Sequence, residues 1–350
     1  MVRRRSVAGF MAGAFGLAVT LAIAFVIAIV LIFLLSRQPG KTIYFFFVGP
    51  LTNKYYFGNM LNTAIPLVFT GLGIAIAFKS SVFNLGGEGQ VYAGSLVVTA
   101  ICLSLPNTNG YLGGFLAVAG GLLTGAVLAG LPGFFRMKWG TEELISSFLI
   151  SGAVVLIVNY FITGPLDDPS NSLLATRKVA EQYRLLKIFL PSKLDISSVF
   201  AVLTAGVLYI LMYYTHWGYE MRMCGLNREF SRYGGINVST YLVLPMVLSG
   251  ALHGLAGGAS ILGTHHAALK EFSFGMGWNG IAVALIAKNH PLGVVPAAIF
   301  FAYLDAGAKA AMLHSDVTFE IAAIVQSIIF YLITAQALYK FLRYGKRTAA

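Results

Sequence analysis

Long apolar stretches alternate with short polar segments along almost the whole chain. Ten such stretches can be followed, over residues 7–35, 61–78, 91–105, 112–135, 144–162, 197–214, 240–262, 279–288, 292–312 and 319–338. A helix needs about 20 apolar residues to cross a membrane, and most of the stretches approach that length. The pattern therefore predicts an all-α polytopic membrane protein with about ten transmembrane helices, within a range of eight to ten.

Composition and charge agree with membrane spans. Only 11% of the 350 residues are charged, whereas a soluble domain carries roughly 25%. The formal net charge of +11 comes from basic residues spread among the polar segments, which favours positive-inside flanking over a nucleic-acid-binding face. Counting ten spans from a cytoplasmic start puts both termini and the basic segments 136–138 and 222–232 in the cytoplasm. The long polar segment 163–196 then lies outside, although it is also basic.

One polar, glycine-rich run separates the second and third apolar stretches, and it reads Phe83-Asn84-Leu85-Gly86-Gly87-Glu88-Gly89-Gln90. An ionisable group among membrane spans is costly and usually marks a pathway or a site. Three glycines in five residues predict a backbone that is not regular helix. The run therefore indicates transport machinery. Its glutamate is either a pathway residue or a structural anchor for the glycine turn.

A similar glycine spacing recurs in the second half of the chain. Phe83-x-x-Gly86-x-x-Gly89 precedes the third apolar stretch, and Phe274-x-x-Gly277-x-x-Gly280 precedes the eighth. The predicted topology places the first at the inner face and the second at the outer face. This is the pattern of an inverted repeat, or a chance match of three residues. If the repeat is real, two helix N-termini point into the membrane and offer N–H donors to a polar solute.

Two further spacings predict packing within the spans. Gly250, Gly254 and Gly258 recur every four residues, which places small residues on one helix face and allows a close helix contact. Asp305 and Lys309 are four residues apart in the ninth stretch, which predicts an internal ion pair on one helix face. That pair is either structural or a direct solute contact.

The segment 216–238 is basic and amphipathic, and by itself it fits an anionic lipid surface or a partner protein. Its part Cys224-Gly225-Leu226-Asn227-Arg228-Glu229-Phe230-Ser231-Arg232-Tyr233-Gly234-Gly235-Ile236-Asn237 resembles the cytoplasmic coupling helix of permease subunits of bacterial ATP-binding-cassette (ABC) importers, in the branch for simple sugars, branched-chain amino acids and nucleosides. The runs 248–258, 277–287 and 289–293 also resemble segments of that family, and the run 83–90 resembles its nucleoside-transporting members. The similarity covers roughly residues 60–335.

The resemblance implies a type II-like permease whose single domain spans residues 1–350, with 1–59 less similar and 216–238 as the cytoplasmic coupling segment. It implies a transport subunit in the bacterial cytoplasmic (inner) membrane, not an enzyme, with no catalytic residue, cofactor or metal of its own. ATP and Mg would be held by a partner ATPase. The other implied partners are a second, different permease chain, an extracytoplasmic substrate-binding lipoprotein and membrane lipid, with no nucleic acid.

The same resemblance, together with residue chemistry, gives the candidate site. Neutral hydrogen-bonding and aromatic groups would line a nucleoside path, and Glu88 would be either a pathway residue or an anchor. The candidate residues are Phe83, Asn84, Glu88, Gln90, Trp278 and Asn279. The residues expected to couple to the ATPase are Cys224, Gly225, Leu226, Asn227, Glu229, Arg232 and Gly235. In this chain Phe230, Ser231 and Arg232 replace the alanine-rich centre of the family segment, which predicts a specific ATPase contact.

Two kinds of alternative stay open at this point. One keeps the family and changes the solute, to riboflavin or a simple sugar. The other changes the class, to an ion-coupled secondary transporter that works alone. Such a transporter needs a charged coupling site deep in the spans, for which Asp305 and Lys309 are the candidate pair.

Overall fold

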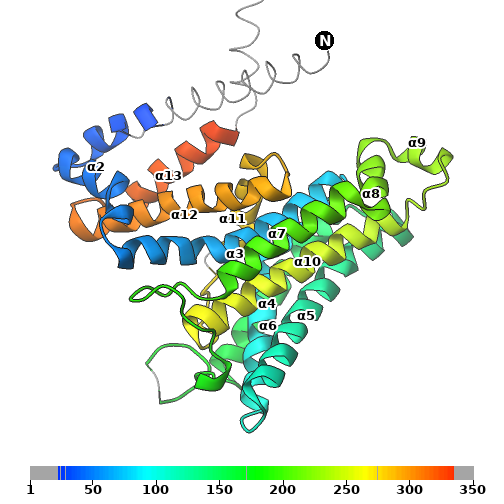
Figure 1. The fold of residues 1–350 in the computed structure, drawn as a ribbon, viewed down its shortest axis with the longest axis horizontal. Helices are drawn as coiled ribbons and strands as arrows, with labels where there is room; N and C mark the ends of the chain where they lie inside the picture. The colour runs from blue at the N-terminus through cyan, green and yellow to red at the C-terminus, as the bar shows by residue number, and fades with distance from the viewer. Residues whose placement is uncertain (1–22, 24, 28, 171, 274, 335–350) are drawn as a thin grey trace, which may run out of the picture. The chain divides into compact units, whose positions relative to one another are not determined.

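In the computed structural model, every regular element of the described residues is a helix, apart from three isolated bridges. The structure describes residues 23–334 except 24, 28, 171 and 274. In chain order (Figure 1) the elements are α2 (Pro39–Phe47), η1 (Gly49–Leu51), α3 (Lys54–Lys79), α4 (Gly87–Ser104), α5 (Gly110–Trp139), α6 (Glu143–Thr163), η2 (Glu181–Tyr183), α7 (Ser197–Tyr214), α8 (His216–Leu226), α9 (Arg228–Tyr233), α10 (Thr240–Ser260), η3 (Ile261–His265), α11 (Met276–Ile286), α12 (Pro291–His314) and α13 (Phe319–Thr334).

The all-helical prediction is confirmed, whereas the predicted count of ten spans is not. Among the described residues, six helices are long and apolar enough to cross a membrane: α3, α5, α6, α7, α10 with its continuation to His265, and α12. α4, α11 and α13 are not among the six, although each coincides with a predicted span. The first predicted span, 7–35, lies mostly outside the described residues, and Phe25–Leu35 is a shorter apolar helix.

The chain divides into two compact units. One holds the residues up to Met60 and those from Ala302 onward, and the other holds Leu61–Phe301. In the first unit, the Tyr303 hydroxyl donates to the Phe47 carbonyl at 2.5 Å. The Asp305–Lys309 ion pair is confirmed, with 2.6 Å between its charged atoms, but 61% of the Lys309 side chain is exposed. The pair is therefore not the internal one that was predicted.

Close helix packing forms the centre of the second unit. α5 and α10 run side by side (Figure 1), and α4 packs against both. A Cβ atom added to Gly250 would strike the carbonyl oxygen of Gly125, and one added to Gly254 would strike that of Gly121. The predicted small-residue face is confirmed, because only glycine allows the two backbones to come this near.

We expect Gly254→Ala to lower the melting temperature of the purified protein by several degrees. The added methyl group meets a backbone carbonyl that cannot rotate away, and overpacking of this kind costs about 1–3 kcal/mol. Gly114→Ala, in α5, is the matched control because a Cβ there has nothing within 4 Å. Equal melting temperatures for the two variants, measured in the same detergent, would contradict this packing.

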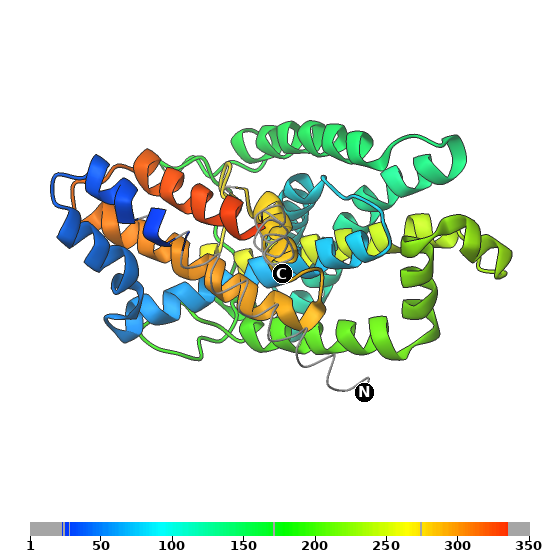
Figure 2. The same ribbon diagram turned by 90° about the horizontal axis from the view of Figure 1, so that it is seen from above.

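At one end of the second unit, the long segment between α6 and α7 pairs with the chain after α10. Its backbone N–H groups at Thr176 and Leu185 donate to the carbonyls of Ala268 and Leu262, at 2.9 and 3.0 Å. Apart from η2, its described residues form no helix, as predicted for a polar segment between spans. At the other end of α7 and α10 lie α8 and α9. Figure 2 shows α8 running across the end of α7, with α9 beyond it.

Candidate functional site at the start of α4

The glycine-rich run is extended in its first half and helical in its second. Residues 82–86 are non-helical, and α4 begins at Gly87. The expectation of an irregular backbone is therefore confirmed for Phe83–Gly86 and wrong for Gly87–Gln90. A carboxylate in the first turn favours a helix start there, because it complements the positive end of the helix dipole, and Glu88 occupies that turn.

Side chains on one face of α6 satisfy the backbone of the extended segment. The Glu143 carboxylate accepts from the N–H of Phe83 at 3.2 Å, and the Ser147 hydroxyl accepts from that of Leu85 at 3.0 Å. One turn further, the Ser151 hydroxyl accepts from the N–H of Gly89 at 2.8 Å. A backbone that leaves the helical ladder among membrane spans needs such partners, because lipid offers none.

Two buried amides lock the turn before α4. Asn84 and Gln90 exchange two hydrogen bonds of 2.9 Å between their side chains, and Asn84 also donates to the Ser249 hydroxyl at 2.9 Å. The Asn84 oxygen accepts from the N–H of Gly86 at 3.0 Å. Both side chains are almost fully buried. In this conformation the polar groups of these two predicted pathway residues bind one another, Ser249 and the protein's own backbone.

Glu88 joins the start of α4 to the start of α11. Its carboxylate accepts hydrogen bonds from the N–H groups of Gly275 and Gly277, at 3.1 and 3.0 Å, and from the Ser273 hydroxyl. The N-terminal end of a helix favours a negative charge, so the Glu88 carboxylate, which belongs to α4, stabilises the start of α11. These bonds support the interpretation of Glu88 as an anchor, and what it anchors is a second helix.

The two glycine-rich helix starts therefore meet. The topology that placed them at opposite faces is wrong, since those faces are about 30 Å apart and the Glu88 carboxylate lies 3.0 Å from the Gly277 nitrogen. Phe274, the first residue of the second motif, lies outside the described residues, and the inverted repeat stays a prediction. We call this meeting point of Gly87, Glu88, Gly275 and Gly277 the α4–α11 junction.

The remaining predicted pathway residues are partly accessible. Phe83 is 42% exposed and Trp278 is 39% exposed, while Asn279 is half-buried. The Phe83 ring makes an edge contact with Phe78, and the Trp278 ring makes one with Phe148 of α6. The two aromatic rings are thus available for stacking, in contrast to the buried amides.

Local capping explains how the predicted coupling segment folds. The Thr215 side chain caps α8 by accepting from the N–H of Gly218, and the Asn227 side chain caps α9 by accepting from that of Phe230 at 3.0 Å. Gly235 follows α9 with a φ of +81°, which favours glycine. The segment thus consists of two helices that meet at Asn227.

The inner side of this segment packs against the link between α3 and α4. A Cβ on Gly225 would collide with the Lys79 carbonyl. The Ser81 hydroxyl donates to the Gly225 carbonyl at 2.7 Å, and the Arg228 guanidinium donates to the Ser81 carbonyl at 2.7 Å. Cys224 is buried, and this burial raises the pKa of its thiol. Movement of α8 and α9 would therefore also displace Ser81, which lies two residues before Phe83.

The outer side of the segment presents an apolar stripe. Leu226 is 80% exposed, Phe230 is 61% exposed and Tyr233 is 91% exposed. Phe230 and Tyr233, three residues apart on α9, lie on one helix face, and Leu226 ends α8 just before them. Glu229 and Arg232 form an exposed ion pair of 3.7 Å on α9. Exposed apolar side chains rimmed by charge are typical of a protein interface.

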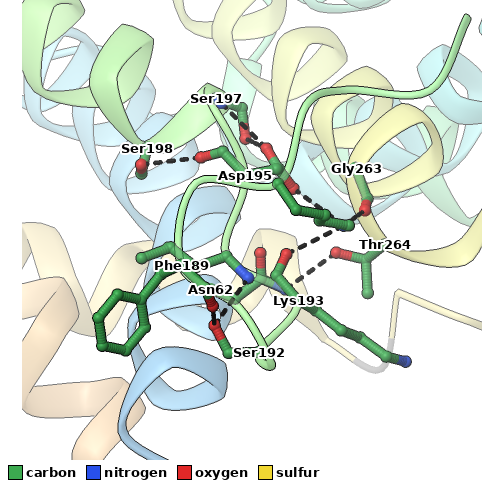
Figure 3. A network of polar contacts seen from close by, with 11 residues as sticks. Asn62, Phe189, Ser192, Lys193, Asp195, Ser197, Ser198, Gly263 and Thr264 are labelled. Atoms are coloured by element: carbon green, nitrogen blue, oxygen red, sulfur yellow. Dashed lines mark hydrogen bonds and ion pairs between the residues drawn. The ribbon is translucent and has the colours of Figure 1, made fainter. Parts of the chain in front are cut away.

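A polar network holds the long loop onto the end of α10 (Figure 3). The Asp195 carboxylate accepts from the N–H of Ser197 at 2.9 Å and pairs with the Lys187 ammonium at 3.8 Å. The Lys187 ammonium also donates to the Gly263 carbonyl, and burial lowers the pKa of this lysine. The Asn62 amide of α3 donates to Thr264 at 2.9 Å. The loop is thereby fixed to the start of α7 and to η3, and α3 is bound to η3 as well.

Sequence reasoning missed the polar face of α6. Glu143 begins α6, pairs with Arg136 and supports the backbone of Phe83. The signal was present, since Glu143, Ser147 and Ser151 stand four residues apart in a mostly apolar span, and this spacing places them on one face. By contrast, no spacing in the sequence could have paired Ser81 with Arg228.

Six helices able to cross a membrane among the described residues, together with a helix start that polar side chains hold in place, define a polytopic membrane transport protein. The chain belongs to the family of branched-chain amino acid transport system permease components, which matches residues 56–334. It is therefore a transport subunit of an ABC transporter, not an enzyme. Permeases of this kind work with partners that include an ATPase and a second permease.

Three relatives illustrate the range of the family. The "Probable riboflavin import permease protein RfuC" of Treponema pallidum is 34% identical, over 91% of this chain and 84% of its own length. The guanosine ABC transporter permease protein NupP of Bacillus subtilis is 30% identical, over 82% and 83%. The glucose ABC transporter permease protein TsgB13 of Haloferax volcanii is 29% identical, over 86% and 82%.

Proposed function

We propose that this chain is a permease subunit of an ATP-driven nucleoside importer in the bacterial cytoplasmic membrane, with both termini in the cytoplasm. The observation that carries the proposal is the direct contact of the α8–α9 segment with the chain that leads into the α4–α11 junction. That contact gives a partner ATPase a mechanical route to the centre of the helical unit.

The proposed mechanism is a population shift between two access states. A cytoplasmic ATPase binds the stripe of Leu226, Phe230 and Tyr233 and moves α8 and α9 when ATP binds. The movement passes through Gly225 to Ser81 and then to α4. An extracytoplasmic substrate-binding lipoprotein delivers the solute at the end of the unit that carries the 163–196 loop. A second, different permease chain completes the path.

The choice of a nucleoside rests on the resemblance of the run 83–90 to nucleoside-transporting permeases and is supported by the similarity to NupP. A nucleoside combines a flat ring with hydroxyl and N–H groups, which Phe83 and Trp278 can stack and polar groups can bind. Riboflavin is the second candidate, favoured by the similarity to RfuC, and it shares the same combination of flat ring and hydroxylated chain.

We expect the reconstituted importer, with its ATPase, second permease and binding protein, to accumulate radiolabelled guanosine only when ATP is enclosed in the vesicles, on the same side of the membrane as the ATPase. A tenfold excess of unlabelled adenosine should reduce this uptake more than the same excess of riboflavin or glucose. Uptake of riboflavin in place of guanosine would replace the nucleoside assignment, and uptake without ATP would contradict the ABC importer mechanism.

A further inference from the structure

One buried histidine at the α4–α11 junction lacks a hydrogen-bond partner on one side. His253, in α10, has no exposed surface. Its Nδ1 lies 2.7 Å from the carbonyl oxygen of Ser249. In the part of the chain that the structure describes, its Nε2 has no hydrogen-bond partner. Buried polar groups are nearly always paired, so an unpaired one calls for a functional explanation.

The tautomer of this ring follows from its one bond. A carbonyl oxygen can only accept, so Nδ1 carries the hydrogen and donates to Ser249. Burial favours the neutral ring, because an unpaired charge is costly away from water. The Nε2 atom is then an acceptor with a free lone pair, and it requires an N–H or O–H donor.

The free nitrogen points at the place where the helix starts meet. A Cβ added to Gly87, the first residue of α4, would lie 2.6 Å from Nε2 and 3.2 Å from the carbonyl oxygen of Gly277. The other side of the ring faces Gly73 of α3, where a Cβ would lie 3.0 Å from Nδ1. Glycines on both sides thus make room for the imidazole directly beneath the first turn of α4.

The hydrogen bonds of Glu88 hold the starts of α4 and α11 together beside Nε2 of His253. While the carboxylate binds Gly275, Gly277 and Ser273, the starts of α4 and α11 cover Nε2. An alternating-access cycle that separates the two helices would uncover the acceptor together with the N–H groups of the first helix turns, which lack partners within their own helices. Acceptor and donors would then face one opening.

We propose that His253 is a solute-binding residue whose Nε2 accepts a hydrogen bond from an N–H or O–H group of a neutral, ring-bearing polyol when the α4–α11 junction opens. The chemistry of the proposed nucleoside solute fits this acceptor, so the proposal rests on the proposed function and assigns it a specific contact.

The test compares guanosine with analogues that each lack one donor, namely 1-methylguanosine and the 2′-, 3′- and 5′-deoxy forms, in transport by the reconstituted importer. The wild type should discriminate against one of them by about three- to tenfold in KM, the effect of one neutral hydrogen bond. His253→Phe should abolish the discrimination against that analogue and leave the KM values of the other analogues, relative to guanosine, unchanged. His253→Gln, which keeps an acceptor oxygen, should retain part of the discrimination. Met246→Leu, a buried volume-conserving change in the same helix, is the control.

An identical pattern of discrimination in His253→Phe and wild type would overturn the proposal. If His253→Phe fails to assemble, thiol labelling of His253→Cys decides instead, since Cys102 and Cys224 are buried. A maleimide should react when ATP and the binding protein drive the cycle, and solute should protect the thiol. No reaction under turnover would overturn the assignment. If the wild type transports riboflavin but not guanosine, the nucleoside function fails, and protection by riboflavin still tests His253.

Discussion

Gly225→Ala should separate ATP hydrolysis from transport in the assembled importer. The new Cβ collides with the Lys79 carbonyl, so α8 must move away from the α3–α4 link and the Ser81 hydrogen bond to the Gly225 carbonyl is lost. The apolar stripe that would bind the ATPase lies on the other side and stays intact. We expect uptake to fall at least about tenfold, the result of a barrier raised by about 1.4 kcal/mol, while ATP hydrolysis stays within about twofold of wild type.

Gly234→Ala is the matched control for this experiment. Gly234 directly follows α9, has a φ of −75°, and has nothing closer than 3.4 Å to an added Cβ. It should leave both uptake and hydrolysis unchanged. A normal ratio of solute transported to ATP hydrolysed in Gly225→Ala would refute the assignment of this contact to coupling.

Glu88→Ala should reduce uptake by a similar factor through a different step. The substitution leaves the N–H groups of Gly275 and Gly277 and the Ser273 hydroxyl without their acceptor. Hydrogen bonds to a charged group contribute about 1.5–3 kcal/mol each. Their loss destabilises the closed junction and shifts the population towards the open one. Uptake in reconstituted vesicles should drop at least about tenfold, with the ATPase still bound to the permease.

Two further variants serve as comparisons for Glu88→Ala. Glu88→Gln keeps one acceptor oxygen and should be intermediate between alanine and wild type. Glu181→Gln changes a glutamate whose side chain is 87% exposed in a surface pair with Arg184, and it should have no effect. Unchanged uptake in Glu88→Ala would remove this residue from any part in transport.

Much of the fold could be predicted from the apolar pattern alone. The predicted boundaries of α7 agree with the structure, and those of α5 and α6 agree within a few residues, because each is a long apolar run that ends at polar residues. The count of spans could not be predicted as well. α4 and α11 begin within the helical unit at glycine-rich turns, and hydropathy does not distinguish such a helix from a full span.

The candidate site was identified by its unusual residues, but its arrangement was not. Polar groups among apolar spans were an adequate signal for Asn84, Glu88 and Gln90. Whether such groups face a solute or each other depends on tertiary contacts between α4, α6, α10 and α11. The structure pairs the amides with each other and Glu88 with α11. His253 lay within a motif noted for its glycines, and its unpaired nitrogen becomes visible only in three dimensions.

Movement of α8 and α9 is expected to open the α4–α11 junction. Spin labels at Phe83→Cys and Trp278→Cys, both on partly exposed positions beside the junction, measure this directly by pulsed electron spin resonance in the reconstituted importer. We predict that ATP and the loaded binding protein shift the distance between the labels by several ångströms, and that Gly225→Ala abolishes the shift. An unchanged distance in an importer that transports, or an equal shift in Gly225→Ala, would contradict the account.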